Sequence, residues 1–141
     1  MMRVLFLCIH NSARSQMAEA YLKKFGGNNF VVESAGLEAG KLNPLAVEAM
    51  RLDEIDISKN ETHLVDQFYI ERRQYDFVIT VCDEANAARC PIFPGPHKKI
   101  NWSFTDPSSL SGTYEEKLMQ TIEVREKIKN SVLNFIQPLP H

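Results

Sequence analysis

The chain has 141 residues, of which 44% are hydrophobic, and this size and composition fit one globular domain spanning residues 1–141. Its 16 basic and 18 acidic residues give a formal charge of −2, so no overall positive field favours nucleic acid or an anionic membrane as a partner. No apolar run approaches the ~20 residues that a membrane span requires. Three cysteines in such a chain favour catalytic or redox use over structural disulfides, and we expect a cytoplasmic protein.

Strands and helices are predicted to alternate along the first part of the chain. Residues 3–7 and 29–34 form apolar runs typical of strands. Residues 15–25 between them carry apolar side chains at helical spacing, and Gly26 and Gly27 are expected to end that helix. This part of the chain therefore predicts a strand, a helix and a second strand.

The same alternation continues to the end of the chain. A proline opens a predicted helix over residues 44–52, and a short helix is expected over residues 64–69. Residues 75–81 are continuously apolar, as in a strand buried on both faces of a parallel sheet, and residues 99–104 form a shorter, more polar strand. Residues 113–136 have the spacing of one long amphipathic helix.

This order of elements predicts an α/β fold, a doubly wound four-stranded parallel sheet with helices on both faces. Arg125 interrupts the apolar stripe of the last helix. We expect its aliphatic stem to lie along apolar neighbours and its charged head to reach water.

The most informative motif joins the first strand to the first helix. Cys8 ends the apolar run, and Arg14 follows six residues later, where the helix begins. Such a loop curls successive amide N–H groups around a tetrahedral anion, and the helix directs the positive end of its dipole at the same point. The arginine adds a planar fork that matches two anion oxygens. The predicted oxyanion-binding residues are Ile9, His10, Asn11, Ser12, Ala13, Arg14 and Ser15.

Within this motif Cys8 is the predicted nucleophile. Inward N–H groups, the helix dipole and the arginine are expected to bring its pKa below the ordinary value of about 8.5. Ser15 could donate a hydrogen bond to the thiolate, or could be an ordinary first-turn serine. Asn11 is expected to shape the loop, because asparagine tolerates left-handed backbone, and His10 is interpreted as a solvated neighbour.

Two further residues are placed with Cys8 by the predicted topology. Cys82 follows the third strand and Asp106 follows the fourth, so all three lie at carboxyl ends of parallel strands, which share one edge of the sheet. Asp106 is the candidate general acid, with an ordinary Asp-Pro turn as the alternative. Cys82 and Cys90 are candidate redox thiols, with a buried strand-end cysteine and an unrelated loop thiol as the alternative.

At these residues the chain resembles the low-molecular-weight tyrosine phosphatase superfamily, whose phosphate loop is Cys-x5-Arg-Ser followed by Met-Ala-Glu on the first helix. The likeness continues through Glu33-Ser34-Ala35-Gly36 after the second strand and Trp102 to Pro107 after the fourth. Within the superfamily, the pair Cys82 and Cys90, followed by proline, resembles the thioredoxin-coupled arsenate reductases.

That resemblance implies a thiol relay. Cys8 would attack arsenate, and water would depart with a proton from Asp106. Cys82 would then attack the Cys8 sulfur and release arsenite, and Cys90 would move the disulfide to Cys82–Cys90 for reduction by thioredoxin. Phosphate and sulfate would compete with arsenate, no cofactor would be bound, and a monomer is expected. Residues 83–89 are predicted to be a helix in the reduced protein that unwinds when this disulfide forms.

Three departures from the family pattern bear on this expectation. The loop has Ala13 where phosphatases often carry a second cysteine, which favours the reductase. Seven residues separate Cys82 from Cys90, whereas the best-known reductases of this type have six. A monovalent cation binds beside the loop in some relatives, and Asn11, Glu19 and Ser34 match that site, but His63 stands where an aspartate would be expected.

Two other functions stay open from the sequence. One is a phosphatase acting on phosphotyrosine or small phosphate esters, in which water hydrolyses a phosphocysteine. Serines follow Pro107 where an aromatic wall would suit a phosphotyrosine ring, and this favours a small substrate. The other is a sensor that binds an oxyanion without catalysis.

Overall fold

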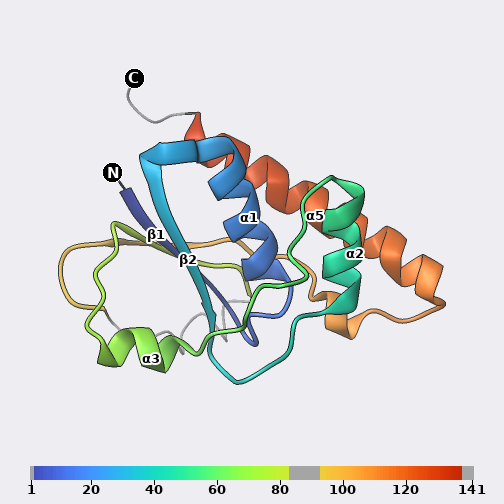
Figure 1. Cartoon of the computed structure of the whole chain (residues 1–141), viewed down its shortest axis with the longest axis horizontal. Coiled ribbons are helices and arrows are strands. Elements are labelled where there is room, and N and C mark those ends of the chain that lie inside the picture. The colour runs from blue at the N-terminus through green and yellow to red at the C-terminus, as the bar shows by residue number, and fades with distance from the viewer. Residues whose placement is uncertain (1, 83–92, 138–141) are drawn as a thin grey trace.

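A computed structural model describes residues 2–82 and 93–137. Its centre is a four-stranded parallel sheet, as the sequence predicts, and the strand order is β2-β1-β3-β4 (Figure 1). The strands are β1 (Met2–Cys8), β2 (Phe30–Gly36), β3 (Phe77–Thr80) and β4 (Lys98–Asn101). Because the strands are parallel, their carboxyl ends share one edge of the sheet.

Strand register determines which residues meet at that edge. Cys8 pairs with Gly36 of β2, and Leu7 pairs with Thr80 of β3. The Val81 N–H also donates to the Leu7 carbonyl at 2.7 Å. Cys8 is therefore flanked by the ends of two strands, and Cys82 comes directly after one of them.

The predicted helices are present with bounds that shift by a residue or so. They are α1 (Arg14–Gly26), α2 (Pro44–Leu52), α3 (Val65–Ile70) and α5 (Tyr114–Ile136), with short 3-10 turns η1 (Gly27–Asn29) and η2 (Pro107–Ser109). Their ends follow local chemistry. Gly27, at a φ of 57°, ends α1, and the Asn43 side chain accepts from the Leu45 N–H at the start of α2. Thr113 and Glu116 form a capping box that starts α5.

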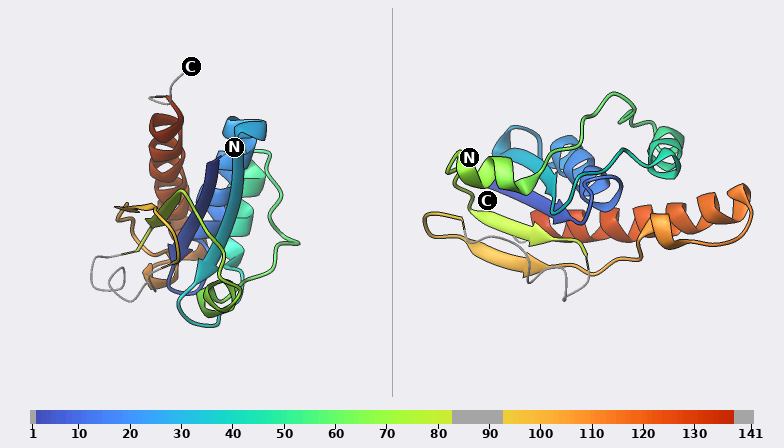
Figure 2. Two further views of the ribbon diagram at one scale, coloured as in Figure 1. Left: turned by 90° about the vertical axis from the view of Figure 1, so that its left-hand side faces the viewer. Right: turned by 90° about the horizontal axis from the view of Figure 1, so that it is seen from below.

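The two faces of the sheet are covered unequally. Helices α1, α2 and α5 lie together over one face, and α3 lies apart from them (Figures 1 and 2). The first face contributes Val4, Phe6 and Ile79, which pack against buried side chains such as Met17, Met50 and Ile128 of those helices. The second face contributes Leu5, Leu7 and Val78, which pack against Val65, Phe68 and Phe93.

Two sequence-based expectations are wrong. Strand β4 ends at Asn101 and not at Phe104, because its neighbour β3 ends at Thr80 and the Trp102 N–H makes the last bond to that residue. The head of Arg125 is largely withdrawn from water: the side chain is only 12% exposed. Its guanidinium donates to the Ala49 carbonyl at 2.7 Å and pairs with Glu126 at 3.0 Å, so protein groups take most of the place that solvent was expected to have. Among the described residues, no helix combines the length and apolar character needed to cross a bilayer.

Candidate active site

The turn between β1 and α1 holds the residues predicted to bind an oxyanion. Cys8 is the last residue of β1 and is buried, and Arg14 is the first residue of α1. Asn11 has a φ of 54°, the left-handed conformation that the sequence predicts. No side chain caps the start of α1, so the positive end of the helix faces the loop.

Strand β2 supports this loop from behind. The Glu38 N–H donates to the Ile9 carbonyl at 2.8 Å, just after the strand ends. A Cβ atom on Gly36 would lie 2.6 Å from the His10 carbonyl carbon and 2.7 Å from the Asn11 nitrogen. The contact is with backbone, which cannot rotate away as a side chain can. Glycine is therefore required here for the loop to approach the sheet.

The amide of Asn11 joins the loop to three other segments. It is fully buried, and its Oδ1 accepts from the His63 N–H at 2.9 Å and from Gln16 Nε2 at 3.2 Å. Because a backbone N–H can only donate, the oxygen end of the amide must lie on that side. Its nitrogen then donates to Ser15 Oγ at 2.8 Å and to Ser34 Oγ at 2.9 Å. Every hydrogen-bonding position of this side chain has a partner.

The orientation of the Asn11 amide indicates which atom donates in the hydrogen bond between Ser15 and Cys8. Ser15 Oγ lies 2.9 Å from the Cys8 sulfur, at a distance where either atom could donate. Since Ser15 already accepts from Asn11, its own hydroxyl proton is free to be given to the sulfur. The arrangement thus favours a cysteine that accepts a hydrogen bond, which is the state that suits a thiolate.

Arg14 brings Asp106 to the loop. Its guanidinium is buried, donating to the Phe104 carbonyl at 3.2 Å and lying 3.3 Å from Asp106 Oδ2. The other carboxylate oxygen accepts from the N–H and the hydroxyl of Ser108 at 2.9 and 2.8 Å. These bonds place Asp106 at the start of η2, with one oxygen fixed and the other facing the arginine. The predicted nucleophile, anion clamp and acid therefore come from three segments to one place.

Cys82 lies at the same edge of the sheet. Its side chain is buried, as is that of Cys8. The register pairs Leu7 with Thr80, so one step further Cys8 lies opposite Val81, and Cys82 is the next residue along the chain. Cys90, the proline after it and the predicted helix over residues 83–89 lie outside the described residues.

Two contributors to this site were not predicted from the sequence. Gln16 is buried, and its amide nitrogen donates to the Asn11 carbonyl at 3.1 Å and to the Glu61 carbonyl at 3.0 Å. A glutamine in a first helical turn is ordinary, so nothing in the sequence signals this role. Gly36 stands in the Glu-Ser-Ala-Gly segment, and only the register explains its contact with the loop. His10 pairs with Glu38 at 3.5 Å and is partly exposed, in line with the solvated neighbour that was expected.

The residues that match a cation site in some relatives do meet in this structure. Ser34 Oγ donates to one oxygen of Glu19, and the other oxygen accepts from the Lys23 ammonium at 2.5 Å. Asn11 presents its NH2 group here, because its oxygen is held by His63. A donor amide and an ammonium do not fit a bound cation. Within residues 2–82 and 93–137, no group of three or more His, Cys, Asp or Glu side chains could hold a metal ion.

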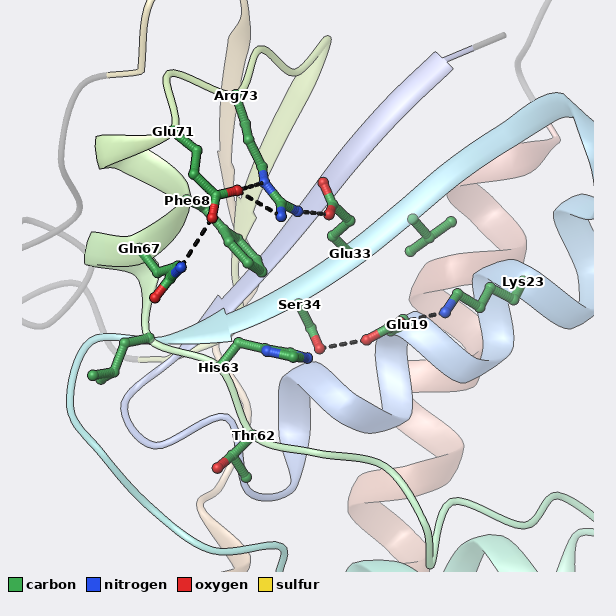
Figure 3. Close-up of a pocket in the computed structure, with 12 residues that line it drawn as sticks. Glu19, Lys23, Glu33, Ser34, Thr62, His63, Gln67, Phe68, Glu71 and Arg73 are labelled. Carbon is green, nitrogen blue, oxygen red and sulfur yellow. Dashed lines mark hydrogen bonds and ion pairs between the residues drawn. The ribbon is translucent and has the colours of Figure 1, made fainter.

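The hydrogen-bond chain from the loop ends at a cavity of about 700 Å³ beside β2 (Figure 3). Arg73 lines this cavity and pairs with the carboxylates of Glu33 and Glu71. Its guanidinium also lies 4.1 Å from the centre of the Phe68 ring. Its charge is therefore already neutralised. The residues that line the cavity include Glu19, Ser34 and His63 but neither Cys8 nor Arg14, so the anion loop and this cavity are separate.

Comparisons with known proteins find arsenate reductases that match nearly the whole chain. The chain is 42% identical over 134 residues to an arsenate reductase from Bacillus licheniformis, covering 95% of this chain and 94% of that protein. A solved arsenate reductase in the phosphate-binding state superposes with a TM-score of 0.74 at 31% identity, covering 99% of this chain and all of that one. A thioredoxin-dependent arsenate reductase from Corynebacterium glutamicum gives a TM-score of 0.69 at 29% identity, covering 97% of this chain and 60% of that one.

The family itself follows from the extent of the match. Residues 3–139 match the low molecular weight phosphotyrosine protein phosphatase family, and this range contains every candidate residue discussed above. The chain belongs to the low molecular weight phosphotyrosine protein phosphatase family.

Proposed function

We propose that this protein reduces arsenate to arsenite with cysteine thiols and that thioredoxin restores the thiols. The observation that carries the proposal is a second buried cysteine, Cys82, near the strand end beside Cys8, because hydrolysis of a phosphate ester needs only the first. The arsenate reductases that the chain resembles over nearly its whole length support the same reaction.

In the first step Arg14 and the loop amides bind the anion, and the Cys8 thiolate attacks arsenic. One arsenate oxygen leaves as water with a proton delivered by Asp106, and a sulfur–arsenic bond forms. The hydrogen bond from Ser15 stabilises the thiolate before attack. Proton delivery to such a leaving oxygen is typically worth about 10² to 10⁴ in rate.

In the second step Cys82 attacks the Cys8 sulfur. The sulfur–arsenic bond breaks, its electron pair stays on arsenic, and arsenite departs as a Cys8–Cys82 disulfide forms. Cys90 then attacks Cys82, which frees Cys8 and leaves a Cys82–Cys90 disulfide. Two electrons have moved from the protein thiols to arsenic. Thioredoxin then supplies two further electrons, which reduce the Cys82–Cys90 disulfide. The seven residues between Cys82 and Cys90 allow this exchange only if residues 83–89 are not helical in the oxidised state.

The test is to compare three variants in two assays. Cys8→Ser should abolish arsenate reduction and any hydrolysis of a phosphate ester. Cys82→Ser and Cys90→Ser should abolish turnover in an assay of NADPH consumption with thioredoxin, thioredoxin reductase and arsenate, and leave ester hydrolysis intact. Equal loss of hydrolysis in all three variants would refute these roles.

A phosphatase is the second candidate, because Cys8, Arg14 and Asp106 already form a complete set for phosphocysteine chemistry. Its substrate would be a small ester, since serines and not an aromatic side chain follow Pro107. Rapid hydrolysis of a phosphate monoester, together with no arsenate-dependent NADPH consumption, would establish this alternative in place of the reductase.

A further inference from the structure

Helix α3 presents an apolar surface on the face of the sheet opposite α1 and α5. Ile70, its last residue, is 78% exposed, and Tyr69 is 46% exposed. Together with Arg72, Phe93 and Pro94 they line a hollow of about 430 Å³. We call these five residues the α3 patch. Of the described residues that line the hollow, none is a carboxylate, and the one charged residue among them, Arg72, is exposed.

The floor of the α3 patch is rigidly held. Phe93 is buried, with its ring edge-on to Tyr75 at 5.2 Å and to Tyr69 at 5.9 Å. On its inner side, α3 buries Val65 and Phe68 in the same core cluster. The base beneath the exposed apolar side chains is therefore packed and does not need to be ordered when a partner binds, which lowers the entropic cost of association.

We propose that the α3 patch is the docking surface for the thioredoxin-class protein that reduces the Cys82–Cys90 disulfide. This inference rests on the proposed function and adds where the reductant binds. The reductant must bring a thiolate to one sulfur of the disulfide, form a mixed disulfide there, and close its own disulfide with a second thiol. The two electrons of the reductant then reside on the thiols of Cys82 and Cys90.

The position of the α3 patch in the chain favours this partner. Phe93 follows Cys90 by three residues, so a fully extended chain separates their Cα atoms by no more than about 11 Å. Weak redox complexes bury about 600 Å² or less on each partner, equivalent to a disc of about 14 Å radius. The contact area of a protein whose reactive thiol reaches Cys90 therefore extends as far as Phe93 and Pro94.

The chemistry of the α3 patch points the same way. The centres of protein interfaces are depleted of charged residues and rich in aromatic and large apolar ones, and Tyr69, Ile70 and Phe93 have that character. A stable dimer of this chain would need a far larger area than a hollow lined by five residues. A transient partner that binds once in each catalytic cycle fits the size.

The experiment measures kcat/KM for thioredoxin at saturating arsenate by NADPH consumption. Ile70→Glu introduces a charge, and Ile70→Ser removes the apolar surface without one. Both should lower kcat/KM about tenfold or more, the loss typical of a central interface residue. Arsenite formed in a single turnover of the pre-reduced protein, and the thermal midpoint, should not change. Met119→Glu changes an apolar residue of α5 that is 67% exposed; it is the matched control and should have no effect.

The outcomes separate the two levels of the argument. Wild-type protein that turns over without thioredoxin would overturn the proposed reductant and the docking surface with it. Thioredoxin-dependent turnover that Ile70→Glu and Ile70→Ser leave unchanged would keep the function and overturn the docking surface. A dimer in sedimentation velocity that Ile70→Glu dissociates would show that the α3 patch binds a second copy, and a loss of single-turnover arsenite would show that it acts within the chain.

Discussion

Asp106→Asn separates proton delivery from anion binding at the candidate site. Asparagine keeps an oxygen that can accept both bonds from Ser108, now 2.9 and 2.8 Å long, so the start of η2 should hold its shape. The variant cannot deliver a proton. The chemical step should therefore slow by about 10²-fold or more.

Anion binding should not weaken in this variant. In the structure Asp106 Oδ2 lies 3.3 Å from the Arg14 guanidinium, so the carboxylate competes with an incoming anion for the same group. The carboxylate side chain is 26% exposed, and an ion pair with such access to water is worth about 0.2–1 kcal/mol. Removing the competitor should tighten phosphate binding by about 1.4- to 5-fold.

Two measurements test both halves of this prediction. Rapid-quench mixing of excess pre-reduced protein with arsenate gives the single-turnover rate, and calorimetry with phosphate gives the dissociation constant. Ser108→Ala, which removes one donor to Asp106 and keeps the acid, should lower the rate by less than about tenfold. An unaltered single-turnover rate in Asp106→Asn would place the acid elsewhere. A severalfold weaker phosphate affinity would refute the competition for Arg14.

Two further predictions concern stability and the shape of the loop. Tyr21→Phe removes a 2.6 Å bond to Asp53 and should cost about 1.5 kcal/mol in urea unfolding at pH 7. That bond holds the pKa of Asp53 below its usual value. The stability it contributes is therefore complete above about pH 4 and disappears as the pH falls through the folded-state pKa of Asp53. A loss of unfolding free energy in Tyr21→Phe that stays constant into acid would contradict this. Gly36→Ala places a methyl against loop backbone and should lower kcat/KM for arsenate more than tenfold. Gly27→Ala meets open space but strains the positive φ that ends α1, so it should lower the thermal midpoint and leave kcat/KM unchanged. Equal kcat/KM in both variants would show that the loop can yield.

The parts of the fold that follow short-range rules could be predicted from the sequence. The apolar run that ends in Cys8 and the helix that starts at Arg14 are neighbours in the chain, so their local pattern was enough. Strand β4 was predicted too long because its end depends on where β3 ends, which is a property of the pairing. The buried head of Arg125 depends on a carbonyl of α2, 76 residues away.

The candidate site divides in the same way. The sequence identified the loop and the residues at the strand ends, because parallel topology places those ends together. It could not give the orientation of the Asn11 amide, since that is fixed by the backbone N–H of His63, 52 residues away. The cation expectation depended on the same point: Asn11, Glu19 and Ser34 are adjacent, but an ammonium and an amide NH2 stand where oxygen ligands would be needed.

The buried amide at position 11 changes how freely the loop sequence can vary. A pattern written Cys-x5-Arg treats the five positions between the ends as equivalent, yet at Asn11 both the backbone and the side chain are specified. A replacement must adopt a positive φ, accept from the backbone N–H of His63 and donate to two serines, and no other common side chain of that length does all three. His10 and Ser12 have more room, because they line an open hollow at the mouth of the loop. We therefore expect saturation mutagenesis of residues 9–13 to tolerate many residues at positions 10 and 12 and almost none at position 11.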